Sequence, residues 1–151
     1  MRLRFPIINL ILVVLVAITL GACQSTGVGG LVDSNAPAEM SAPVAQAIAG
    51  DIVGRFSEQI GPGTATIALK QDDSPFGQAL ETTLRSAGYA VITDQKIGEK
   101  ADPTALAYVV EPFNGKILVR LSTPTVEVGR IYTANSTGAT PASPLSVMRR
   151  G

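Results

Sequence analysis

The sequence predicts an α+β domain in which two helices pack on one face of a mainly antiparallel sheet. Three observations support this fold class. Two segments carry apolar side chains at helical spacing, several others alternate apolar with polar side chains, and an Asn-Gly pair separates two of the alternating segments. The expected order is helix, strand, helix and then four strands. With 151 residues, the chain is long enough for one such domain.

The first helix is expected from residue 42 to about residue 59. Ser41 can cap it, Pro43 suits its first turn, and a central apolar row recurs every four positions at Val44, Ile48, Ile52 and Phe56. Gly61-Pro62-Gly63 ends this helix. The next segment, Thr64–Lys70, places Ala65, Ile67 and Leu69 on one side and predicts a strand.

The second helix has a clear start and a clear end in the sequence. Ser74 and Pro75 match the cap and first helical positions, and Gly88 matches the left-handed residue that commonly follows a helix. Between them, apolar side chains recur at steps of four: Phe76, Leu80 and Leu84. Tyr89–Thr93 then predicts a strand. Because the connection from the previous strand is too long for a hairpin, we expect parallel or split pairing of the two strands.

The remaining strands follow a polar loop at residues 94–104. The segment around Leu106–Val110 is apolar on both faces, which is typical of a central strand. Asn114-Gly115 predicts a hairpin into Lys116–Ser122, with Ile117, Val119 and Leu121 facing the core and Leu118 facing outward. Val126–Tyr132 is expected as the last antiparallel strand, and therefore as a sheet edge with free backbone groups.

The composition of the chain divides it into four expected segments. These are a signal peptide at 1–22, a flexible tether at 23–41, the α+β domain at 42–132 and a disordered tail at 133–151. The tether and the tail are rich in Ser, Gly, Ala, Pro and Thr and lack apolar periodicity. The tail ends in Leu145, Val147 and Met148 beside two arginines, and either docking on a partner or an idle terminus is compatible with this ending.

The N-terminus predicts export and lipid attachment. Two arginines in the first four residues precede an apolar run, and small residues follow it, as in a secretory signal peptide. An uncleaved membrane span is the alternative, but the run is short and includes Pro6 and Asn9. Leu20-Gly21-Ala22-Cys23 resembles the bacterial lipobox, which implies that Cys23 becomes the lipidated first residue. Gln24 after the cysteine resembles the sorting pattern of outer-membrane lipoproteins whose domains face the periplasm.

The composition also limits the chemistry that is available. The chain has no histidine, and its one cysteine is Cys23. An intrachain disulfide, a Ser-His-Asp triad, a Cys-His dyad and a His/Cys zinc site are therefore excluded. Twelve basic and twelve acidic residues argue against a nucleic-acid partner. Asp72 and Asp73 fit a helix start better than a metal site. We expect no catalytic, metal-binding or cofactor-binding residues, and no enzymatic activity.

The chain resembles the conjugal transfer protein TrbH family. The residues that carry the resemblance are the lipobox, the stretch from Ser74 to Tyr89 and the ending Pro144–Arg150. The resemblance implies a structural lipoprotein of the mating-pair-formation apparatus of conjugative plasmids, a type IV secretion system. It implies contact with the membrane through Cys23 and with other subunits of the apparatus, and it leaves oligomerisation within that complex open.

A second resemblance points to another class of function. The stretch from Phe76 to Val91 is also similar to the strand–helix–strand opening of outer-membrane assembly and transport lipoproteins, which act as chaperones for envelope cargo. Co-purification or the identity of neighbouring genes would separate the two functions.

Overall fold

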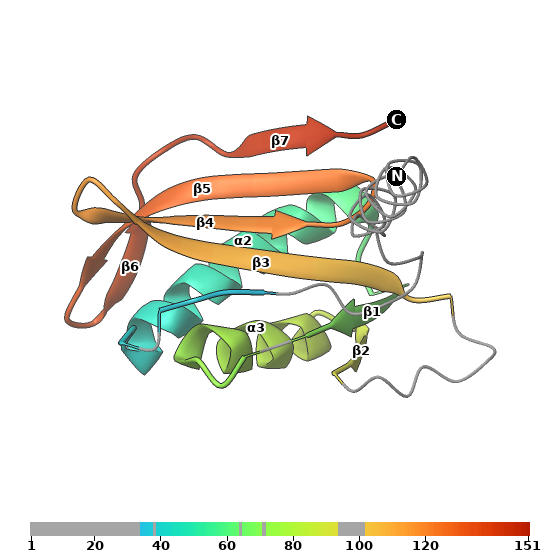
Figure 1. Ribbon diagram of the computed structural model, residues 1–151, viewed down its shortest axis with the longest axis horizontal. Helices are drawn as coiled ribbons and strands as arrows, with labels where there is room; N and C mark the ends of the chain where they lie inside the picture. Colours follow the sequence, from blue (N-terminus) through green and yellow to red (C-terminus); the bar gives the residue numbers. More distant parts are fainter. Residues whose placement is uncertain (1–33, 38, 64, 71, 94–101) are drawn as a thin grey trace, which may run out of the picture.

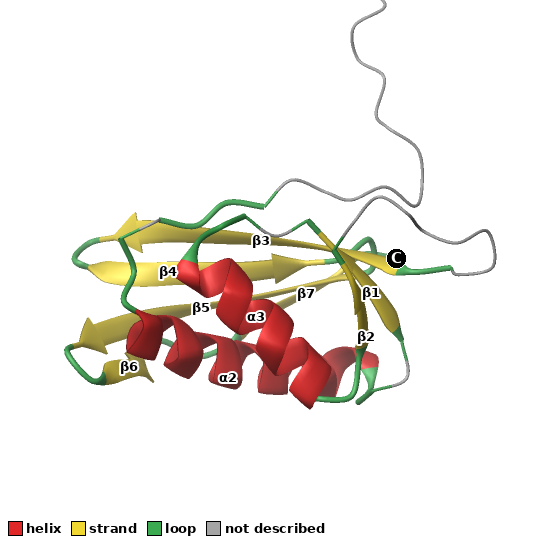
Figure 2. Ribbon diagram, turned by 90° about the horizontal axis from the view of Figure 1, so that it is seen from below, coloured by secondary structure: helices red, strands yellow, loops and turns green. Residues whose placement is uncertain are grey.

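A computed structural model describes residues 34–37, 39–63, 65–70, 72–93 and 102–151. Within these residues, two helices lie against one face of a seven-stranded sheet (Figure 1, Figure 2). The predicted α+β class is confirmed: the sheet is mixed and mostly antiparallel. Neither helix in the described part of the chain combines the length and the hydrophobicity that crossing a lipid bilayer requires.

Both helices form where the apolar spacing predicts them. Helix α2 (Ala42–Ile60) has Pro43 in its first turn and ends at Gly61, whose φ is 93°. Ser41 precedes it in an extended conformation but makes no side-chain cap bond. Helix α3 (Pro75–Ser86) is capped by the Ser74 hydroxyl, which accepts the Gly77 N–H at 3.0 Å. The expected apolar rows are buried: Val44, Ile48, Ile52 and Phe56 on α2, and Phe76, Leu80 and Leu84 on α3.

The sheet has the strand order β2-β1-β3-β4-β5-β6, and β7 also pairs with β5. Strand β1 (Thr66–Leu69) lies parallel to both β2 (Ala90–Ile92) and β3 (Thr104–Phe113). Strand β4 (Lys116–Ser122) is antiparallel to β3 and to β5 (Val126–Asn135). The central position predicted for β3 is therefore confirmed, and of the two pairings expected for β1 and β2, the parallel one forms.

The hairpin between β3 and β4 has the register that the sequence predicts. Asn114 and Gly115 both have positive φ, at 48° and 71°, as a tight hairpin turn requires. Val119 and Leu121 are buried among the helices, whereas Leu118 lies on the opposite face and is only half-buried. The helices and the inner sheet face thus enclose one apolar core.

The tail at 133–151 is structured, so the prediction of disorder is wrong. Strand β5 continues to Asn135, β6 (Gly138–Pro141) turns back along its end, and β7 (Ser146–Arg149) pairs with its beginning. The Asn135 carboxamide closes the first turn by accepting the N–H and the hydroxyl of Thr137, each at 2.9 Å. This segment is ordered by backbone hydrogen bonds to β5, which do not require an apolar pattern in the sequence. Consequently β5 is an interior strand, and β6 and β7 form the edge beside it.

The end of the expected tether is also part of the fold. Asn35 lies parallel to β3, where its N–H donates to the Tyr108 carbonyl at 3.0 Å and its carbonyl accepts the Val110 N–H at 2.9 Å. Met40 is buried. The folded unit therefore includes residues before the predicted start at residue 42, namely Asn35 and Met40. The rest of the tether, the signal peptide and the segment 94–101 lie outside the described residues.

Candidate functional site

The carboxylate of Asp72 joins three parts of the fold. It accepts hydrogen bonds from the N–H of Ser74 at 3.1 Å and from the Ser74 hydroxyl, which places it at the start of α3 as the sequence predicts. It also accepts the Tyr108 hydroxyl of β3 at 2.7 Å and the Ala36 N–H at 3.0 Å. Asp72 is thus the point where the N-terminal segment, the central strand and α3 meet.

The electrostatics of this cluster fix which group carries the proton. Burial raises the pKa of Asp72, but the hydrogen bonds from Ser74, Tyr108 and Ala36 lower it by more, so its pKa lies below the ordinary value. Burial, reinforced by the bond to Asp72 and its negative charge, raises the pKa of Tyr108. At neutral pH the pair is therefore a charged acceptor with a neutral donor, an arrangement that holds a fold together.

A second polar cluster joins α2 to β5. Arg130 Nη1 lies 3.2 and 3.0 Å from the two carboxylate oxygens of Asp51, and the Tyr132 hydroxyl donates to the same carboxylate at 2.8 Å. Arg130 Nε also donates to the Ser143 carbonyl at 3.0 Å. Burial raises the pKa of Tyr132, and the hydrogen bond to Asp51 acts in the same direction, so this hydroxyl stays protonated. The cluster fixes the loop that leads into β7.

Sequence reasoning missed this second cluster, although a signal for it exists. Arg130 lies between Val128 and Tyr132 on the core-facing side of β5. A charge at a core-facing strand position requires a partner, because an unpaired buried charge is costly. Asp51 on α2 is that partner.

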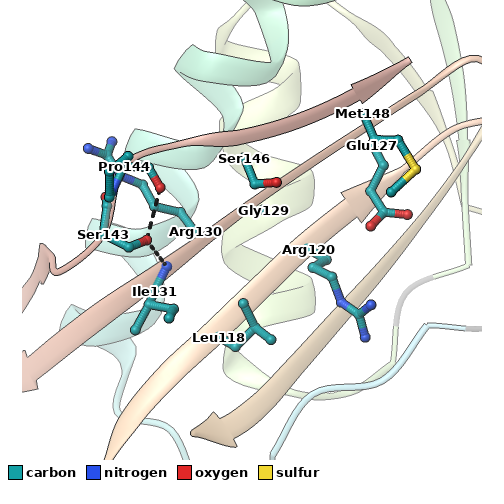
Figure 3. A pocket seen from close by; sticks show the side chains of 10 residues that line it. All are labelled: Leu118, Arg120, Glu127, Gly129, Arg130, Ile131, Ser143, Pro144, Ser146 and Met148. Atoms are coloured by element: carbon teal, nitrogen blue, oxygen red, sulfur yellow. Dashed lines mark hydrogen bonds between the residues drawn. The ribbon is translucent and has the colours of Figure 1, made fainter. Parts of the chain in front are cut away.

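The outer face of the sheet, away from the helices, contains a shallow hollow of about 200 Å³ (Figure 3). Leu118 of β4 and Ile131 of β5 form part of its floor, and the segment that carries Pro144 and Met148 forms one wall. Gly129 also lines the hollow and leaves room for its neighbour, because an added Cβ would lie 3.2 Å from Cγ of Arg120.

The charged groups around this hollow form ion pairs, but within the described residues the buried Nε of Arg120 has no hydrogen-bond partner. Glu127 accepts Arg150 at 2.7 Å and the Ser122 hydroxyl at 2.9 Å. Arg120 lies 3.8 Å from Glu111. Among the residues that the structure describes, no group of three or more Cys, Asp or Glu side chains could hold a metal ion.

The residues predicted to carry the lipid lie outside the described part of the chain. Cys23 and the lipobox residues Leu20, Gly21 and Ala22 all precede residue 34. Lipid attachment at Cys23 therefore stays a prediction.

Comparison with known proteins decides the family. The family model described as "Conjugal transfer protein TrbH" matches residues 26–151. The chain belongs to the TrbH family. A curated relative, "Probable conjugal transfer protein TrbH" from Sinorhizobium fredii (strain NBRC 101917 / NGR234), is 47% identical over 135 residues, which cover 87% of this chain and 90% of the relative. No solved structure matches the chain.

The TrbH family match covers the whole described domain. It includes the N-terminal segment around Asn35 and both C-terminal strands, β6 and β7. The resemblance seen in the sequence is thereby confirmed, and the parts of the fold that composition suggested were disordered fall within the family's own span.

Proposed function

We propose that this TrbH protein is an outer-membrane lipoprotein that serves as a non-catalytic structural subunit of a mating-pair-formation apparatus, the type IV secretion system of a conjugative plasmid. The observation that carries the proposal is the family match over residues 26–151. The geometry supports a structural role, because Asp72, Asp51 and Arg130 all have hydrogen-bond partners that join one element to another.

The anchor in this proposal is Cys23. The preceding Leu20-Gly21-Ala22 resembles the lipobox, and the chain offers no competing cysteine. Several acyl chains, at about 0.8 kcal/mol per buried methylene, would hold the domain firmly on a bilayer where one chain would not. Other subunits of the apparatus would then contact the domain from the periplasm, through the outer sheet face.

One substitution tests lipid attachment at Cys23, and another tests sorting to the outer membrane. Cys23→Ser should leave an unprocessed precursor and abolish plasmid transfer, because the thiol that receives the lipid is lost. Gln24→Asp should keep the lipid but retain the protein in the inner membrane, whereas the matched control Gln24→Ser should stay in the outer membrane. Intact-mass spectrometry and membrane fractionation measure these outcomes.

Clear results would contradict the proposal. A mature wild-type protein that starts at another residue, or that carries an unmodified Cys23, would rule out the lipoprotein assignment. Plasmid transfer at the normal level after deletion of the gene would rule out the structural role. Co-purification with outer-membrane cargo in cells without the plasmid, in place of secretion subunits, would favour the chaperone function.

A further inference from the structure

Strand β7 forms an open edge of the sheet. It pairs antiparallel with β5, with Val128 opposite Val147 and Gly129 opposite Ser146. Figure 1 shows β7 running along the outside of β5. In the described part of the chain, no strand pairs with the other side of β7.

The hydrogen bonds to β5 show which backbone groups of β7 point outward. The Arg150 N–H donates to the Thr125 carbonyl at 2.8 Å. Because alternate residues of an antiparallel strand bond to the same neighbour, Met148 and Ser146 also turn their backbone groups toward β5. Val147 and Arg149 therefore direct their N–H and C=O groups away from the sheet, where a further strand can bond to them.

This edge strand is short, but half of its residues carry exposed apolar side chains. Of the three large exposed hydrophobic side chains in the described residues, two belong to β7: Val147 is 41% exposed and Met148 is 53% exposed. Edge strands are commonly protected by a proline, a bulge or an inward-pointing charge. Strand β7 is only four residues long and carries the charged Arg149, but it has no proline, and its pairing with β5 is continuous.

The nearby arginines do not oppose a second copy of the strand. Arg149 donates to the Gln59 side chain of α2 at 3.0 Å, and Arg150 is paired with Glu127 at 2.7 Å. The charge of Arg150 is therefore paired within its own domain, whereas Arg149 keeps its charge and bonds to a neutral carboxamide. A second copy of β7 brings its own Arg149, so it can pair only in a register that keeps the two Arg149 side chains apart.

We propose that β7 pairs antiparallel with β7 of a second copy of this chain, about a two-fold axis at Val147. Only outward-directed residues can bond across the new edge, and in this register the two Val147 residues exchange a pair of N–H···O bonds. Ser146 then lies beside Met148, and Leu145 lies beside Arg149. No like charges face each other across the axis, so the strand is complementary to itself, as a two-fold interface requires.

The size of the contact sets the conditions under which this dimer forms. A few residues from each copy bury far less than the roughly 1,200 Å² of a stable interface. The dimer is therefore weak in dilute solution, and it forms where copies are held close together, because a shared surface raises their effective concentration. This inference concerns self-association alone and does not depend on the proposed role in conjugation.

Disulfide trapping tests the register. In the full-length chain carrying Cys23→Ser, an introduced cysteine is the only one present. Paired Val147 residues would have Cα atoms about 5.5 Å apart, within the disulfide range of about 4.4–6.8 Å. Leu145 would be about four positions away from its copy, or about 13 Å along the strands. In detergent at high protein concentration, Val147→Cys should form covalent dimers at least about tenfold faster than the matched control Leu145→Cys.

A blocking variant completes the experiment. Val147→Pro removes the outward N–H without taking a bond from β5, so light scattering should show the loss of concentration-dependent dimers while the melting temperature is kept. Equal trapping rates for Val147→Cys and Leu145→Cys would overturn the proposal. So would a wild-type chain that stays monomeric at every concentration, and the edge would then be open to a strand of another protein.

Discussion

Gly77 lies in the first turn of α3, and its substitution by alanine should destabilise the protein, the opposite of the usual effect in a helix. Replacing a helical glycine by alanine normally stabilises a protein by up to about 1 kcal/mol. At Gly77, however, the added Cβ would lie 2.5 Å from the Tyr108 hydroxyl oxygen and 2.8 Å from both the carbonyl oxygen and a carboxylate oxygen of Asp72. The new methyl group would occupy space that the Tyr108–Asp72 hydrogen bond needs.

The structure allows the size of the effect to be worked out. Overpacking in a close-packed site costs about 1–3 kcal/mol. Weakening the Tyr108 bond to the charged Asp72 would cost about 1.5–3 kcal/mol. The two costs overlap, since moving the hydroxyl relieves the clash, so they are not added. Set against a helix-propensity gain of up to about 1 kcal/mol, Gly77→Ala should lower the free energy of unfolding by about 1–2 kcal/mol.

Urea unfolding measures this change, and Gly54→Ala provides the matched control. Gly54 lies in the middle of α2, is exposed, and has no atom within 4 Å of an added Cβ. Its substitution should raise the free energy of unfolding by about 0.5–1 kcal/mol. For a urea slope of about 1.5 kcal/mol/M, the Gly77→Ala midpoint should fall by about 1 M. A Gly77→Ala chain as stable as the wild type would refute the close packing described for α3 and β3.

Three further outcomes follow from the packing. Leu84→Ala should cost about 2–5 kcal/mol in urea melts and the half-buried Leu118→Ala clearly less; equal losses would contradict the strand register. Because the folded-state pKa of Asp72 lies below its ordinary value of 3.8, its carboxylate adds stability above that pH, and this is lost as the pH falls through the lower folded value. Asp72→Asn should therefore be less stable at neutral pH and flatten the acid side of a melting-temperature profile. Deleting residues 142–151 should lower the melting temperature, because β5 loses the pairing with β7; unchanged melting would show that β7 contributes nothing to the fold.

The elements that the sequence predicts are those with local signals. Helix α3 has a serine cap, a proline and apolar side chains at steps of four, and the β3–β4 hairpin has an Asn-Gly turn. Strands β6 and β7 and the segment around Asn35 have none of these. They are ordered by backbone bonds to strands that lie elsewhere in the chain, as when Asn35 pairs beside Val109. Pairing of this kind leaves little trace in the composition of the segment that joins the sheet.

The polar clusters also depend on contacts between distant parts of the chain, which the sequence predicts poorly. The role of Asp72 at the start of α3 could be predicted, since Ser74 and Pro75 follow it directly. Its bond to Tyr108 could not, because the two residues are 36 positions apart and only the packing of α3 against β3 brings them together. Arg130 is different, since its core-facing place in β5 does indicate a partner, although not which acidic residue supplies it.

Because Asn35 pairs with β3, the tether between the domain and any anchor at Cys23 is shorter than the sequence suggests. Eleven residue steps separate Cys23 from Ser34, and they span at most about 40 Å when fully extended. A tether that ended at residue 41 would span about 65 Å. With the proposed lipid on Cys23, the domain would reach little more than its own diameter from the bilayer. Its binding partners would have to extend into that thin layer, because the domain could not travel across the periplasm to meet them.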